Sequence, residues 1–485
     1  MRPLDFLLKG ADQWPQKEAL NTKDEVFTFG ELRSRVLKVT GFLKNRGLTP
    51  GTPVSLYIED YSVFFTAIFS VWAAGGVVIP MNLSLPLEIR LKIEQKARPL
   101  IGLINGPIVT TGYNGMCYID IQEFKNQGDS GNSNPYEARE DDTAMIMFTS
   151  GTTGMTKAIP CSHRMLALNA SLMSDVLKLT HKDKIFINTP PYYTSAINHL
   201  LTCYANGAGI AARAGFYFGV DILKEMENLD CTGLGGAPTH MIRIVETAGP
   251  NERTENLRFF MSSGDHLPEH VIEKSLELFP DVEIYTVYGL SEVGGRLCSL
   301  TPEFLPDKNG SVGKPLPGMT VTVRREDLSE AGTGETGEVY IEGPLVMDGY
   351  MDDEKSNKEL LSPLGFRTGD FGYKDEDGFL YLEGRKDDIF KSGSEKVSTI
   401  LIQKALQRRK EFSDVAVAPV KDSLMGNVAV AYYVMREGKY FERKPVVKYL
   451  ISVLPSSHIP KKFIEVDEIP RTGSGKVKRK ELIKI

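Results

Sequence analysis

The sequence predicts an α/β protein with a large N-terminal domain of mostly parallel sheets and helices, which also carries a β subdomain, and a small α+β C-terminal domain. The chain has 485 residues, well beyond the roughly 250–300 residues at which one hydrophobic core stops growing. Over the first four-fifths of the chain, short apolar runs alternate with amphipathic stretches, as expected for buried strands joined by helical crossovers. After about Ser311 the pattern changes to short strands and glycine-rich turns.

The strands of the N-terminal domain are predicted from short runs of β-branched and aromatic residues. These runs are Val54–Ile58, Val77–Pro80, Leu100–Ile104, Thr143–Phe148, Lys184–Asn188, Leu257–Met261 and Val282–Val287. Amphipathic helices are predicted between some of them, at Glu31–Asn45 and Glu269–Leu278. The later antiparallel β subdomain is predicted from the closely spaced glycines 332, 334, 337, 343 and 349.

A domain boundary is predicted just after the strand candidate Phe379–Leu382, because a charged, turn-prone stretch follows at Gly384–Asp388. The predicted domains are therefore residues 1–386 and 387–485. In the second domain we expect two helices and three strands, near Thr399–Arg409, Val415–Val420, Val428–Met435, Pro445–Leu454 and Phe463–Val466. The segment Pro470–Lys476 is too rich in glycine and proline for regular structure and is predicted to be a mobile loop.

The charge is unevenly distributed between the two predicted domains. Hydrophobic residues make up 41% and charged residues 25% of the chain, as in a globular protein. The net charge is −6, but residues 387–485 hold 20 Lys and Arg against 12 Asp and Glu. The small domain thus carries +8 and the remainder −14, which favours an anionic partner or simply a solvated basic face. The basic residues are not interleaved with stacking aromatic residues, so we expect no nucleic-acid partner.

The cysteines and the apolar segments predict a cytoplasmic protein without a membrane partner. We expect no signal peptide, and the longest apolar run, Ser62–Pro80, is interrupted by Gly75 and Gly76. The cysteines are odd in number, far apart and without metal-ligand spacing, which is typical of buried thiols in a reducing compartment. They are Cys117, Cys161, Cys203, Cys231 and Cys298.

A loop rich in glycine and hydroxyl groups directly follows the strand candidate that ends at Phe148. It reads Thr-Ser-Gly-Thr-Thr-Gly-Met-Thr-Lys over residues 149–157. Small residues let backbone N–H groups approach an anion, and the lysine adds a positive charge. The loop therefore predicts a triphosphate site, although its spacing differs from the G-x-x-x-x-G-K-[ST] pattern of P-loop proteins. The residues concerned are Thr149, Ser150, Gly151, Thr152, Thr153, Gly154 and Lys157.

This loop resembles the phosphate-binding signature of the adenylate-forming superfamily, which includes acyl-CoA synthetases, adenylation domains of nonribosomal peptide synthetases and firefly luciferase. Further motifs of that superfamily follow in the same order and extend through nearly the whole chain, so the match is specific. They are Tyr288-Gly-Leu-Ser-Glu292, Thr368-Gly-Asp370, Gly384-Arg-Lys-Asp387, Lys391–Val397 and Pro470–Lys476. The resemblance implies an AMP-forming ligase that converts a carboxylic acid to an acyl-adenylate with ATP and Mg²⁺, and then transfers the acyl group to a thiol.

The resemblance also implies roles for individual residues. Tyr288 would face the adenine, Asp370 would accept the ribose hydroxyls beside Arg385, and Glu292 would hold Mg²⁺. Lys476 would bridge the attacking carboxylate and the α-phosphate, with Glu292 and Thr149 also catalytic. Asp387 would be the hinge about which a mobile C-terminal domain rotates. The remaining nucleotide-binding residues would be Gly264, Asp265, His266, Thr286, Gly289, Leu290 and Ser291. His266 is an unusual occupant of its position, and a surface-turn histidine is the alternative.

The acyl pocket is the part of the site where this sequence departs from its relatives. The resemblance places it at Tyr192, Tyr193, Ser195, Gly236, Ala237, Ser263 and Gly289. Many acyl-CoA synthetases have Pro-Leu-Phe-His where this chain has Pro190-Pro-Tyr-Tyr193. Adenylation domains for amino acids usually place an aspartate near this segment, and none occurs from Tyr192 to Asn198. We therefore expect an acid other than an amino acid, with an aromatic or medium-length acyl group.

The thiol acceptor is left open between two candidates. Lys391–Ser398 resembles acyl-CoA synthetases and favours CoA, whereas Leu454–Pro460 resembles enzymes that load a phosphopantetheinyl carrier protein. The positive charge of the small domain suits either the phosphates of CoA or an acidic carrier protein. CoA is the preferred interpretation. The alternative from another class is a non-catalytic ligand-binding relative, which the presence of Lys476, Glu292 and Asp370 disfavours.

Overall fold

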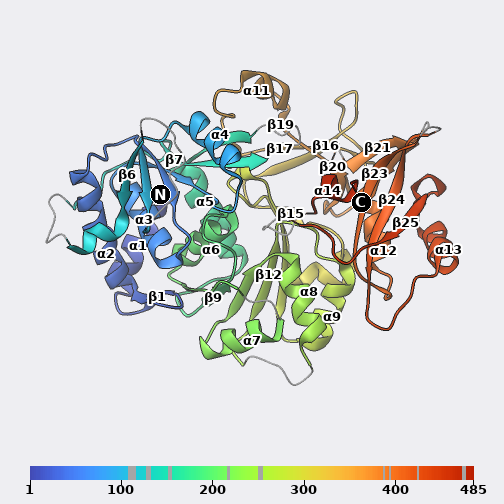
Figure 1. The fold of residues 1–485 in the computed structure, drawn as a ribbon, viewed down its shortest axis with the longest axis horizontal. Coiled ribbons are helices and arrows are strands. Elements are labelled where there is room, and N and C mark those ends of the chain that lie inside the picture. The colour runs from blue at the N-terminus through green and yellow to red at the C-terminus, as the bar shows by residue number, and fades with distance from the viewer. Residues whose placement is uncertain are drawn as a thin grey trace.

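Parallel sheets dominate the first two-thirds of the chain in the computed structural model. The model describes residues 1–106, 116–126, 133–150, 156–215, 219–249, 255–385, 388–392, 395–422, 425–471 and 477–484. The N-terminal elements lie at one end of the molecule and the C-terminal elements at the other, with the middle of the sequence between them (Figure 1).

The first sheet has six strands in its described part, in the order β6-β5-β3-β4-β7-β8. All neighbours are parallel except β7 and β8, which form an antiparallel hairpin. The strands are β3 (Pro53–Tyr57), β4 (Val77–Pro80), β5 (Ile101–Ile104), β6 (Cys117–Asp120), β7 (Thr143–Ser150) and β8 (Thr156–Ser162).

The second sheet has nine strands in its described part, in the order β15-β14-β13-β12-β11-β9-β10-β1-β2. The strands from β13 to β1 in this order are mutually parallel, and β2, β14 and β15 are antiparallel additions at its two sides. The strands are β1 (Glu18–Asn21), β2 (Val26–Thr28), β9 (Lys184–Ile187), β10 (Gly209–Ala212), β11 (Gly233–Gly236), β12 (Phe259–Ser263), β13 (Glu283–Tyr288), β14 (Cys298–Leu300) and β15 (Lys314–Pro315).

Helices fill the space between the two sheets and cover their outer faces. One hydrophobic core joins strands of both sheets to α1 (Pro3–Gln13), α2 (Phe29–Asn45), α3 (Tyr61–Ala73), α5 (His163–Val176) and α6 (Thr194–Ala205). Every residue of α3 is buried, so this helix is packed on all sides. A second core packs α7 (Gly219–Asn228), α8 (Pro238–Thr247) and α9 (Glu269–Leu278) against the nine-stranded sheet.

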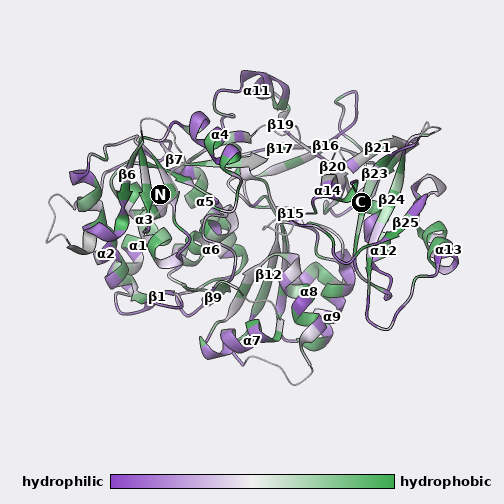
Figure 2. Cartoon of the chain, in the orientation of Figure 1, coloured by the Kyte–Doolittle hydropathy of each residue, from purple (hydrophilic) through white to green (hydrophobic). Residues whose placement is uncertain are grey.

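The short helices complete the N-terminal part. α4 (Leu87–Ala97) packs beside β8. The others are the 3₁₀ segments η1 (Ile121–Asn126), η2 (Ser291–Val293) and η3 (Pro302–Phe304), and the helices α10 (Leu305–Lys308) and α11 (Glu354–Leu360). Hydrophilic residues gather on exposed helices such as α11, whereas the strands are largely hydrophobic (Figure 2).

An antiparallel β subdomain follows the nine-stranded sheet. Its order is β16-β17-β19-β18, with β20 on the other side of β19. The strands are β16 (Thr320–Arg324), β17 (Gly337–Glu342), β18 (Leu361–Ser362), β19 (Gly365–Lys374) and β20 (Leu380–Arg385). β20 includes Gly384 and Arg385, where the sequence predicted a turn. A register shift between Phe371 and Gly372 lets the strand continue, and it places Arg385 opposite Asp370.

The C-terminal part has its own core around a small mixed sheet. β23 (Phe412–Asp422) and β24 (Gly426–Met435) are antiparallel, and β25 (Lys462–Glu465) runs parallel to β24. The other elements are the hairpin of β21 (Ile389–Ser392) and β22 (Glu395–Ser398), the helices α12 (Thr399–Gln407), α13 (Arg443–Val453) and α14 (Arg479–Leu482), and η5 (Ser456–His458). This part lies at the right of Figure 1.

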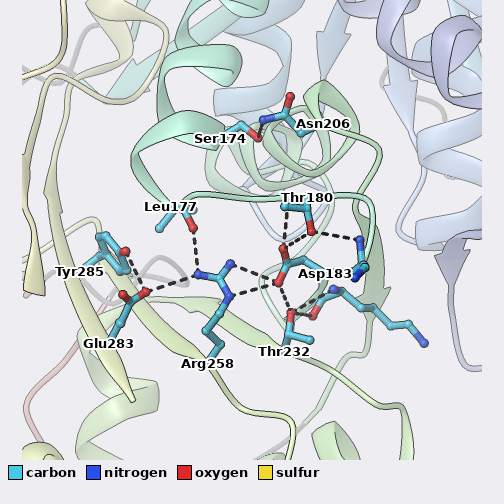
Figure 3. A network of polar contacts seen from close by, with 11 residues as sticks. Ser174, Leu177, Thr180, Asp183, Asn206, Thr232, Arg258, Glu283 and Tyr285 are labelled. Atoms are coloured by element: carbon cyan, nitrogen blue, oxygen red, sulfur yellow. Dashed lines mark hydrogen bonds and ion pairs between the residues drawn. The ribbon is translucent and has the colours of Figure 1, made fainter. Parts of the chain in front are cut away.

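A network of polar contacts joins the amino ends of β9, β11, β12 and β13, which we call the amino edge (Figure 3). The buried carboxylate of Asp183 accepts hydrogen bonds from the Thr180 backbone N–H at 2.8 Å and the Thr232 hydroxyl at 2.9 Å. Arg258 Nη2 lies 3.1 Å from Asp183, and Arg258 Nη1 donates to the Leu177 carbonyl at 3.1 Å and lies 3.4 Å from Glu283. The amino edge therefore consists of charged groups that neutralise one another.

The predicted fold class is confirmed. β4 and α9 have the predicted bounds, whereas β12 and β13 begin two and one residues later than predicted. No helix in the described ranges is long and apolar enough to cross a membrane. All five cysteines lie within those ranges and are free thiols, and four of them are buried.

Candidate active site

The carboxyl ends of β11, β12 and β13 bring together residues that are far apart in the sequence. β11 ends at Gly236, β12 at Ser263 and β13 at Tyr288, and each strand continues into a turn with predicted site residues. In open parallel sheets, ligands bind outside the carboxyl ends of the strands. We call these strand ends and their turns the carboxyl edge.

A three-residue cluster joins the carboxyl edge to the β subdomain. The phenol of Tyr288 donates to Asp370 Oδ2, and Arg385 Nε donates to Asp370 Oδ1 at 3.0 Å. Asp370 is 5% exposed, whereas the Arg385 side chain is 48% exposed. Asp370 raises the pKa of Arg385, and burial together with Asp370 raises the pKa of Tyr288 well above its usual value. The predicted adenine- and ribose-contacting residues therefore meet at one buried carboxylate.

A second cluster connects the predicted metal ligand with the predicted phosphate lysine. Glu292 Oε1 accepts a hydrogen bond of 2.8 Å from the phenol of Tyr350, and Lys157 Nζ lies 4.4 Å from the centroid of the Tyr350 ring. The Tyr350 loop is fixed on both sides by backbone hydrogen bonds: Met351 N–H donates to Ala158, and Met347 N–H donates to Glu292. Burial and Glu292 raise the pKa of Tyr350, so the phenol stays protonated and donates. Tyr350 thus contacts both the Glu292 carboxylate and the Lys157 ammonium group and orients them.

The residues at Glu292 fit a magnesium ion that is shared with a nucleotide. One oxygen of the carboxylate is positioned by Tyr350, and carboxylate oxygen is a preferred ligand of this hard cation. Within the described ranges, no group of three or more His, Cys, Asp or Glu side chains could hold a metal ion. Magnesium in nucleotide sites commonly takes one or two protein carboxylates, with phosphates and water as its other ligands.

The predicted triphosphate loop joins β7 and β8. In the register of this hairpin Thr149 lies opposite Lys157, and Ser150 lies opposite Thr156. Lys157 is therefore placed at the base of the loop, beside the Glu292 cluster. Gly151, Thr152, Thr153 and Gly154 lie outside the described residues, as do the side chains of Thr149 and Ser150.

The turn after β12 contacts the C-terminal part of the chain. Gly264 has a φ of +100°, which favours glycine, and Asp265 accepts a hydrogen bond from the backbone N–H of His266 at 2.8 Å. The His266 side chain is partly buried, and burial, Lys404 and Arg408 hold its pKa well below its usual value. Arg408 of the segment after α12 also pairs with Glu269 of α9 at 3.2 Å.

A cleft lies beside this turn, between α8 and the C-terminal elements α12 and β23. Three residues predicted for the site, Ala237, Asp265 and His266, line it, together with the basic residues Lys404, Arg436 and Arg471. The cleft therefore connects the carboxyl edge with the positively charged part of the chain.

The predicted acyl-pocket residues lie at the start of α6 and at the end of β11. The rings of Tyr192 and Tyr193 are tilted against each other with centroids 4.9 Å apart, and Asn82 donates to the Tyr193 phenol at 3.4 Å. Ser195 follows in the first turn of α6. A Cβ atom added to Gly236 would lie 2.5 Å from His240 Nδ1, so the histidine ring occupies the space that this glycine provides. Ser263 is the last residue of β12, and Gly289 directly follows β13.

Gly289 lies at the closest backbone approach in this site. A Cβ atom at this position would lie 1.6 Å from the carbonyl oxygen of Gly295 and 2.9 Å from Arg296 Cα. The remaining predicted residues lie on the same strand and its turn. Thr286 is in β13, and Leu290 and Ser291 lead into η2. The Thr286 hydroxyl is buried and has no protein partner among the described residues.

Lys476 and Asp387 lie outside the described residues. The residues next to the Lys476 segment are held firmly: Arg471 and Val477 form an antiparallel bridge, and Arg471 pairs with Asp414 of β23 at 2.8 Å. Arg385 and Asp388, on either side of the predicted hinge, are joined by a backbone hydrogen bond of 3.1 Å from Arg385 N–H to the Asp388 carboxylate.

Four residues of this region were not among the predicted site residues: Tyr350, His240, His199 and Arg296. Tyr350 follows a glycine with a φ of +151° after β17, and only its contacts reveal its role. His199 and Arg296 carry a signal that was present in the sequence. Each is a polar residue within an apolar run, His199 in Ala196–Tyr204 and Arg296 before Leu297 and Cys298.

Comparisons with known proteins identify the family of the chain. Residues 7–351 match the family described as AMP-binding enzyme, and residues 401–476 match its companion, the AMP-binding enzyme C-terminal domain. A 2-succinylbenzoate–CoA ligase of Bacillus licheniformis is 27% identical over 484 residues, covering 99% of both chains.

Solved structures are similar over the same length. The o-succinylbenzoate coenzyme A synthetase of Bacillus subtilis, in complex with ATP and a magnesium ion, aligns with a TM-score of 0.88 at 25% identity, covering 98% of each chain. The anthranilate CoA ligase AuaEII in complex with anthranoyl-AMP has a TM-score of 0.92 at 20% identity, covers 100% of this chain and 97% of its own, and supports the fold. The chain thus belongs to the AMP-binding enzyme family and is an ATP-dependent, AMP-forming acid–thiol ligase of the acyl-CoA synthetase type.

Proposed function

We propose that the carboxyl edge binds ATP and a carboxylic acid so that the acid attacks the α-phosphorus, and that CoA then takes the acyl group. In the first step a carboxylate oxygen bonds to the α-phosphorus and pyrophosphate leaves. In the second step the CoA sulfur bonds to the acyl carbon, AMP leaves and the thiol proton is released. The observation that carries the proposal is the Tyr288–Asp370–Arg385 cluster, in which a buried carboxylate lies between the residues proposed to contact the adenosine.

The nucleotide is held by three groups of residues in this proposal. Asp370 accepts the ribose hydroxyls, and Arg385 orients that carboxylate. The 149–154 loop and Lys157 contact the phosphates. Glu292 holds Mg²⁺, oriented by Tyr350, and the bound ion neutralises negative charge where two anions meet. The turn at Gly264, Asp265 and His266, together with Thr286, Leu290 and Ser291, encloses the adenosine.

The C-terminal domain supplies the catalytic lysine. We assign Lys476 to the junction of attacking carboxylate and α-phosphate, with Thr149 as a further donor, and Asp387 to the hinge between residues 1–386 and 387–485. The strand β20 belongs to the N-terminal β subdomain, whereas β21 begins the C-terminal part, which supports a boundary between them. The contacts across the domains include the Arg408–Glu269 ion pair and a longer pair at 3.7 Å between Arg436 and Glu246. Such partly exposed pairs contribute little to stability and can exchange during a rotation.

The acid is proposed to be aromatic or of medium length, bound between Tyr192, Tyr193, Ser195, Gly236, Ala237, Ser263 and Gly289. Two tilted tyrosine rings at the mouth of the pocket suit a flat apolar group. The relatives at 27% identity are named for 2-succinylbenzoate, which is a benzoate and therefore fits this class.

CoA is the proposed acceptor rather than a carrier protein. The stretch Leu454–Pro460, which resembles enzymes that load carrier proteins, has a structural use here: His458 Nε2 accepts a hydrogen bond of 3.1 Å from the Ser398 backbone N–H at the start of α12. Its presence therefore does not favour a carrier protein. CoA also agrees with the relatives that match over the full length, which are named as CoA ligases.

A reducing compartment is proposed as the site of action, namely the cytoplasm. The five cysteines are free, and burial raises the pKa of the four buried thiols. Such thiols are unreactive in a reducing environment.

The function is tested by ATP–pyrophosphate exchange with a panel of carboxylic acids. We expect exchange that depends on both acid and Mg²⁺, release of AMP rather than ADP, and thioester formation with free CoA. Release of ADP without AMP would contradict the mechanism, and thioester formation only with a carrier protein would contradict the acceptor.

The role of the C-terminal domain is tested with Lys476→Ala in the two half-reactions. Adenylate formation should fall by at least about 10²-fold because a charge at the reacting centre is lost. Thioester formation from a pre-made adenylate should be largely retained. Lys478→Ala, two residues further along the exposed tail, is the matched control. An equal loss in both half-reactions would argue against rotation of the domain.

A further inference from the structure

Asn169 is a buried amide in the middle of α5 that contacts the turn after the predicted metal ligand. Its Nδ2 atom donates to the carbonyl of Val293 at 3.1 Å and to the carbonyl of Arg296 at 2.8 Å. The side chain is fully buried, and each of the two N–H groups of the amide has one of these acceptors. Asn169 therefore joins α5 to the backbone of the turn that directly follows Glu292.

An asparagine lowers the stability of a buried helix face unless its hydrogen bonds compensate. Asparagine is a poor helix former, and burying an amide costs free energy where its polar atoms lack partners. The Oδ1 atom of Asn169 is buried without a partner among the described residues. The other buried residues of this helix are mostly apolar and include Met165, Leu166, Ala167, Ala170 and Met173. The two hydrogen bonds to the turn are thus the contribution that this side chain makes.

The turn is fixed on its core side and faces the site on the other side. Val293 and Gly294 are buried, whereas Glu292 is partly exposed. Gly294 and Gly295 have φ values of +73° and +122°, which favour glycine. Asn198 of α6 donates from Nδ2 to the Gly294 carbonyl at 2.8 Å. Side-chain amides from α5 and α6 therefore hold the carbonyl groups of this irregular backbone.

Asn169 belongs to the same continuous segment as the predicted phosphate lysine. Lys157 is the second residue of β8, and α5 follows β8 without an intervening loop. The Ser162 hydroxyl at this junction accepts a hydrogen bond of 3.1 Å from the Met165 N–H, which caps the helix. The position of Asn169 is therefore fixed relative to Lys157 by one strand and one helix.

Glu292 is held from two directions by this arrangement. Tyr350 contacts both its carboxylate and Lys157, and the Met347 N–H donates to its carbonyl at 2.9 Å. Asn169 fixes the turn that follows it. A magnesium ion shared between a carboxylate and phosphates requires that the groups holding them keep a fixed separation. The contacts of Asn169 and Tyr350 both serve that requirement.

We propose that Asn169 is a positioning residue for the magnesium site, which fixes the turn of Glu292 relative to Lys157 so that Mg²⁺ strengthens nucleotide binding. This inference rests on the proposed function, because it assumes that Glu292 holds Mg²⁺ beside the phosphates. Asn169 acts through Glu292 and touches neither the metal nor the nucleotide. Residues that orient metal ligands typically change metal affinity or activity by about 10- to 100-fold.

The first test measures nucleotide binding without catalysis. The probe is α,β-methylene-ATP, in which carbon replaces the oxygen between the α- and β-phosphorus atoms, so that pyrophosphate cannot leave. Calorimetry gives its Kd with and without Mg²⁺ for the wild type and for Asn169→Leu. We expect Mg²⁺ to tighten binding in the wild type, and this gain to be about tenfold smaller in Asn169→Leu, with an unchanged Kd in the absence of Mg²⁺.

Two results would overturn the inference while leaving the proposed function intact. An equal Mg²⁺-dependent gain in the wild type and Asn169→Leu would show that Asn169 only packs α5 against the turn. Binding that is weaker by the same factor with and without Mg²⁺ would show the same. The absence of ATP–pyrophosphate exchange with any acid in the wild type would instead overturn the proposed function itself.

Asn206→Leu is the matched control. Asn206 at the end of α6 also contacts α5, through a hydrogen bond of 3.0 Å from its Nδ2 atom to the Ser174 hydroxyl. We expect this variant to lower Tm without changing the Mg²⁺-dependent gain in nucleotide affinity. A loss of the gain as large as that in Asn169→Leu would overturn the inference, because a general loosening of α5 would then explain both.

Asn169→Ser keeps the inference testable if Asn169→Leu fails to fold. The smaller side chain retains a hydroxyl group, so the Mg²⁺-dependent gain should fall in the same direction but by less. In ATP–pyrophosphate exchange, this variant should need a higher Mg²⁺ concentration for half its maximal rate, with KM for the acid nearly unchanged. An unchanged Mg²⁺-dependent gain in a folded Asn169→Ser protein would overturn the inference.

Discussion

The amino edge and the carboxyl edge of the nine-stranded sheet differ in whether their polar groups are paired within the protein. At the amino edge, Asp183, Arg258 and Glu283 pair with one another and with neighbouring hydroxyl and carbonyl groups (Figure 3). At the carboxyl edge, buried polar atoms of Ser262 and Thr286 have no protein partner among the described residues. The same strands, β12 and β13, therefore carry a completed network at one end and available groups at the other.

Residues that stabilise the fold and residues proposed for catalysis therefore lie at opposite ends of the same strands, only five or six residues apart. Charged residues that pair within the protein fix the strands relative to one another. Removing one member of such a pair leaves the charge of the other buried and unpaired. Buried polar groups without a protein partner lower the stability of the fold. Such groups are expected at a binding site, where the ligand supplies the missing hydrogen-bond partners. Substitutions at the amino edge should thus lower stability, and substitutions at the carboxyl edge should lower activity.

The largest effect is expected at Asp370. Asp370→Ala should reduce kcat/KM for ATP by about 10²–10³-fold, because the carboxylate that is proposed to hold the ribose is lost. Steady-state kinetics at varied ATP concentration measures it. Asp375→Ala is the control in the same subdomain, since it removes the 2.8 Å pair with Lys308 without touching the cluster. A similar loss of activity in both variants would contradict the separation of the two edges.

Asp183→Asn tests the expectation that the amino edge contributes to stability and not to activity. Asp183 is 6% exposed, and Arg258 would lose its carboxylate partner there and keep its contacts with the Leu177 carbonyl and with Glu283. We expect a loss of about 2–3 kcal/mol in the free energy of unfolding, measured by denaturant titration, with kcat/KM for ATP nearly unchanged. Asp141→Asn, at an exposed pair with Arg164, should cost less than about 1 kcal/mol. A stable Asp183→Asn protein with impaired kinetics would reverse the assignment of the edges.

Tyr350→Phe tests a single contact of the site, the hydrogen bond from Tyr350 to the predicted metal ligand Glu292. The variant removes the 2.8 Å hydrogen bond to Glu292 and keeps the ring beneath Lys157. A hydrogen bond to a charged group is worth about 1.5–3 kcal/mol, so we expect a roughly 10- to 100-fold lower activity and a higher Mg²⁺ requirement. Tyr373→Phe, in a stacked pair with Tyr381 away from the cluster, is the control. An unchanged Mg²⁺ dependence would remove Tyr350 from the metal site.

Elements buried on both faces were predictable from the sequence, because their apolar runs are short, dense and bounded by turns. β4 and α9 have the predicted bounds for that reason. β20 was predicted to end before Gly384, since a glycine followed by four charged residues predicts a turn. The register shift opposite Gly372 keeps the strand paired through Arg385, and a register shift depends on the partner strand rather than on local sequence.

The site was predictable only where a motif stays together in the sequence. The residues Tyr288–Glu292 and Asp370 were predicted from their motifs, but the contact of Tyr288 with Asp370 joins residues 82 positions apart. Tyr350 was missed because its partners, Glu292 and Lys157, come from distant segments. Arg296 and His199 were missed because a polar residue in an apolar run gives no information about its partner.

The smallest expected effect is the pH dependence contributed by His240 at the end of β11. Its Nδ1 accepts a hydrogen bond of 3.0 Å from the Ala237 backbone N–H, and burial and Arg243 lower its pKa from 6.5 to about 4. The unfolded chain therefore binds a proton more readily than the native protein between pH 6.5 and 4. The contribution of neutral His240 to stability is fully present above pH 6.5 and is lost as the pH falls towards 4.

His240→Gln should remove this contribution while other histidines continue to titrate. Between pH 7 and pH 5 the free energy of unfolding of the wild type should fall by about 1–2 kcal/mol more than that of His240→Gln, as measured by denaturant titration at the two pH values. Because the amino edge network contains no histidine among its described members, Asp183→Asn should show the same pH dependence as the wild type. An identical pH dependence of the unfolding free energy in wild type and His240→Gln would contradict this prediction. It would mean that the His240 imidazole is accessible to solvent in the native protein, despite its packing against Gly236.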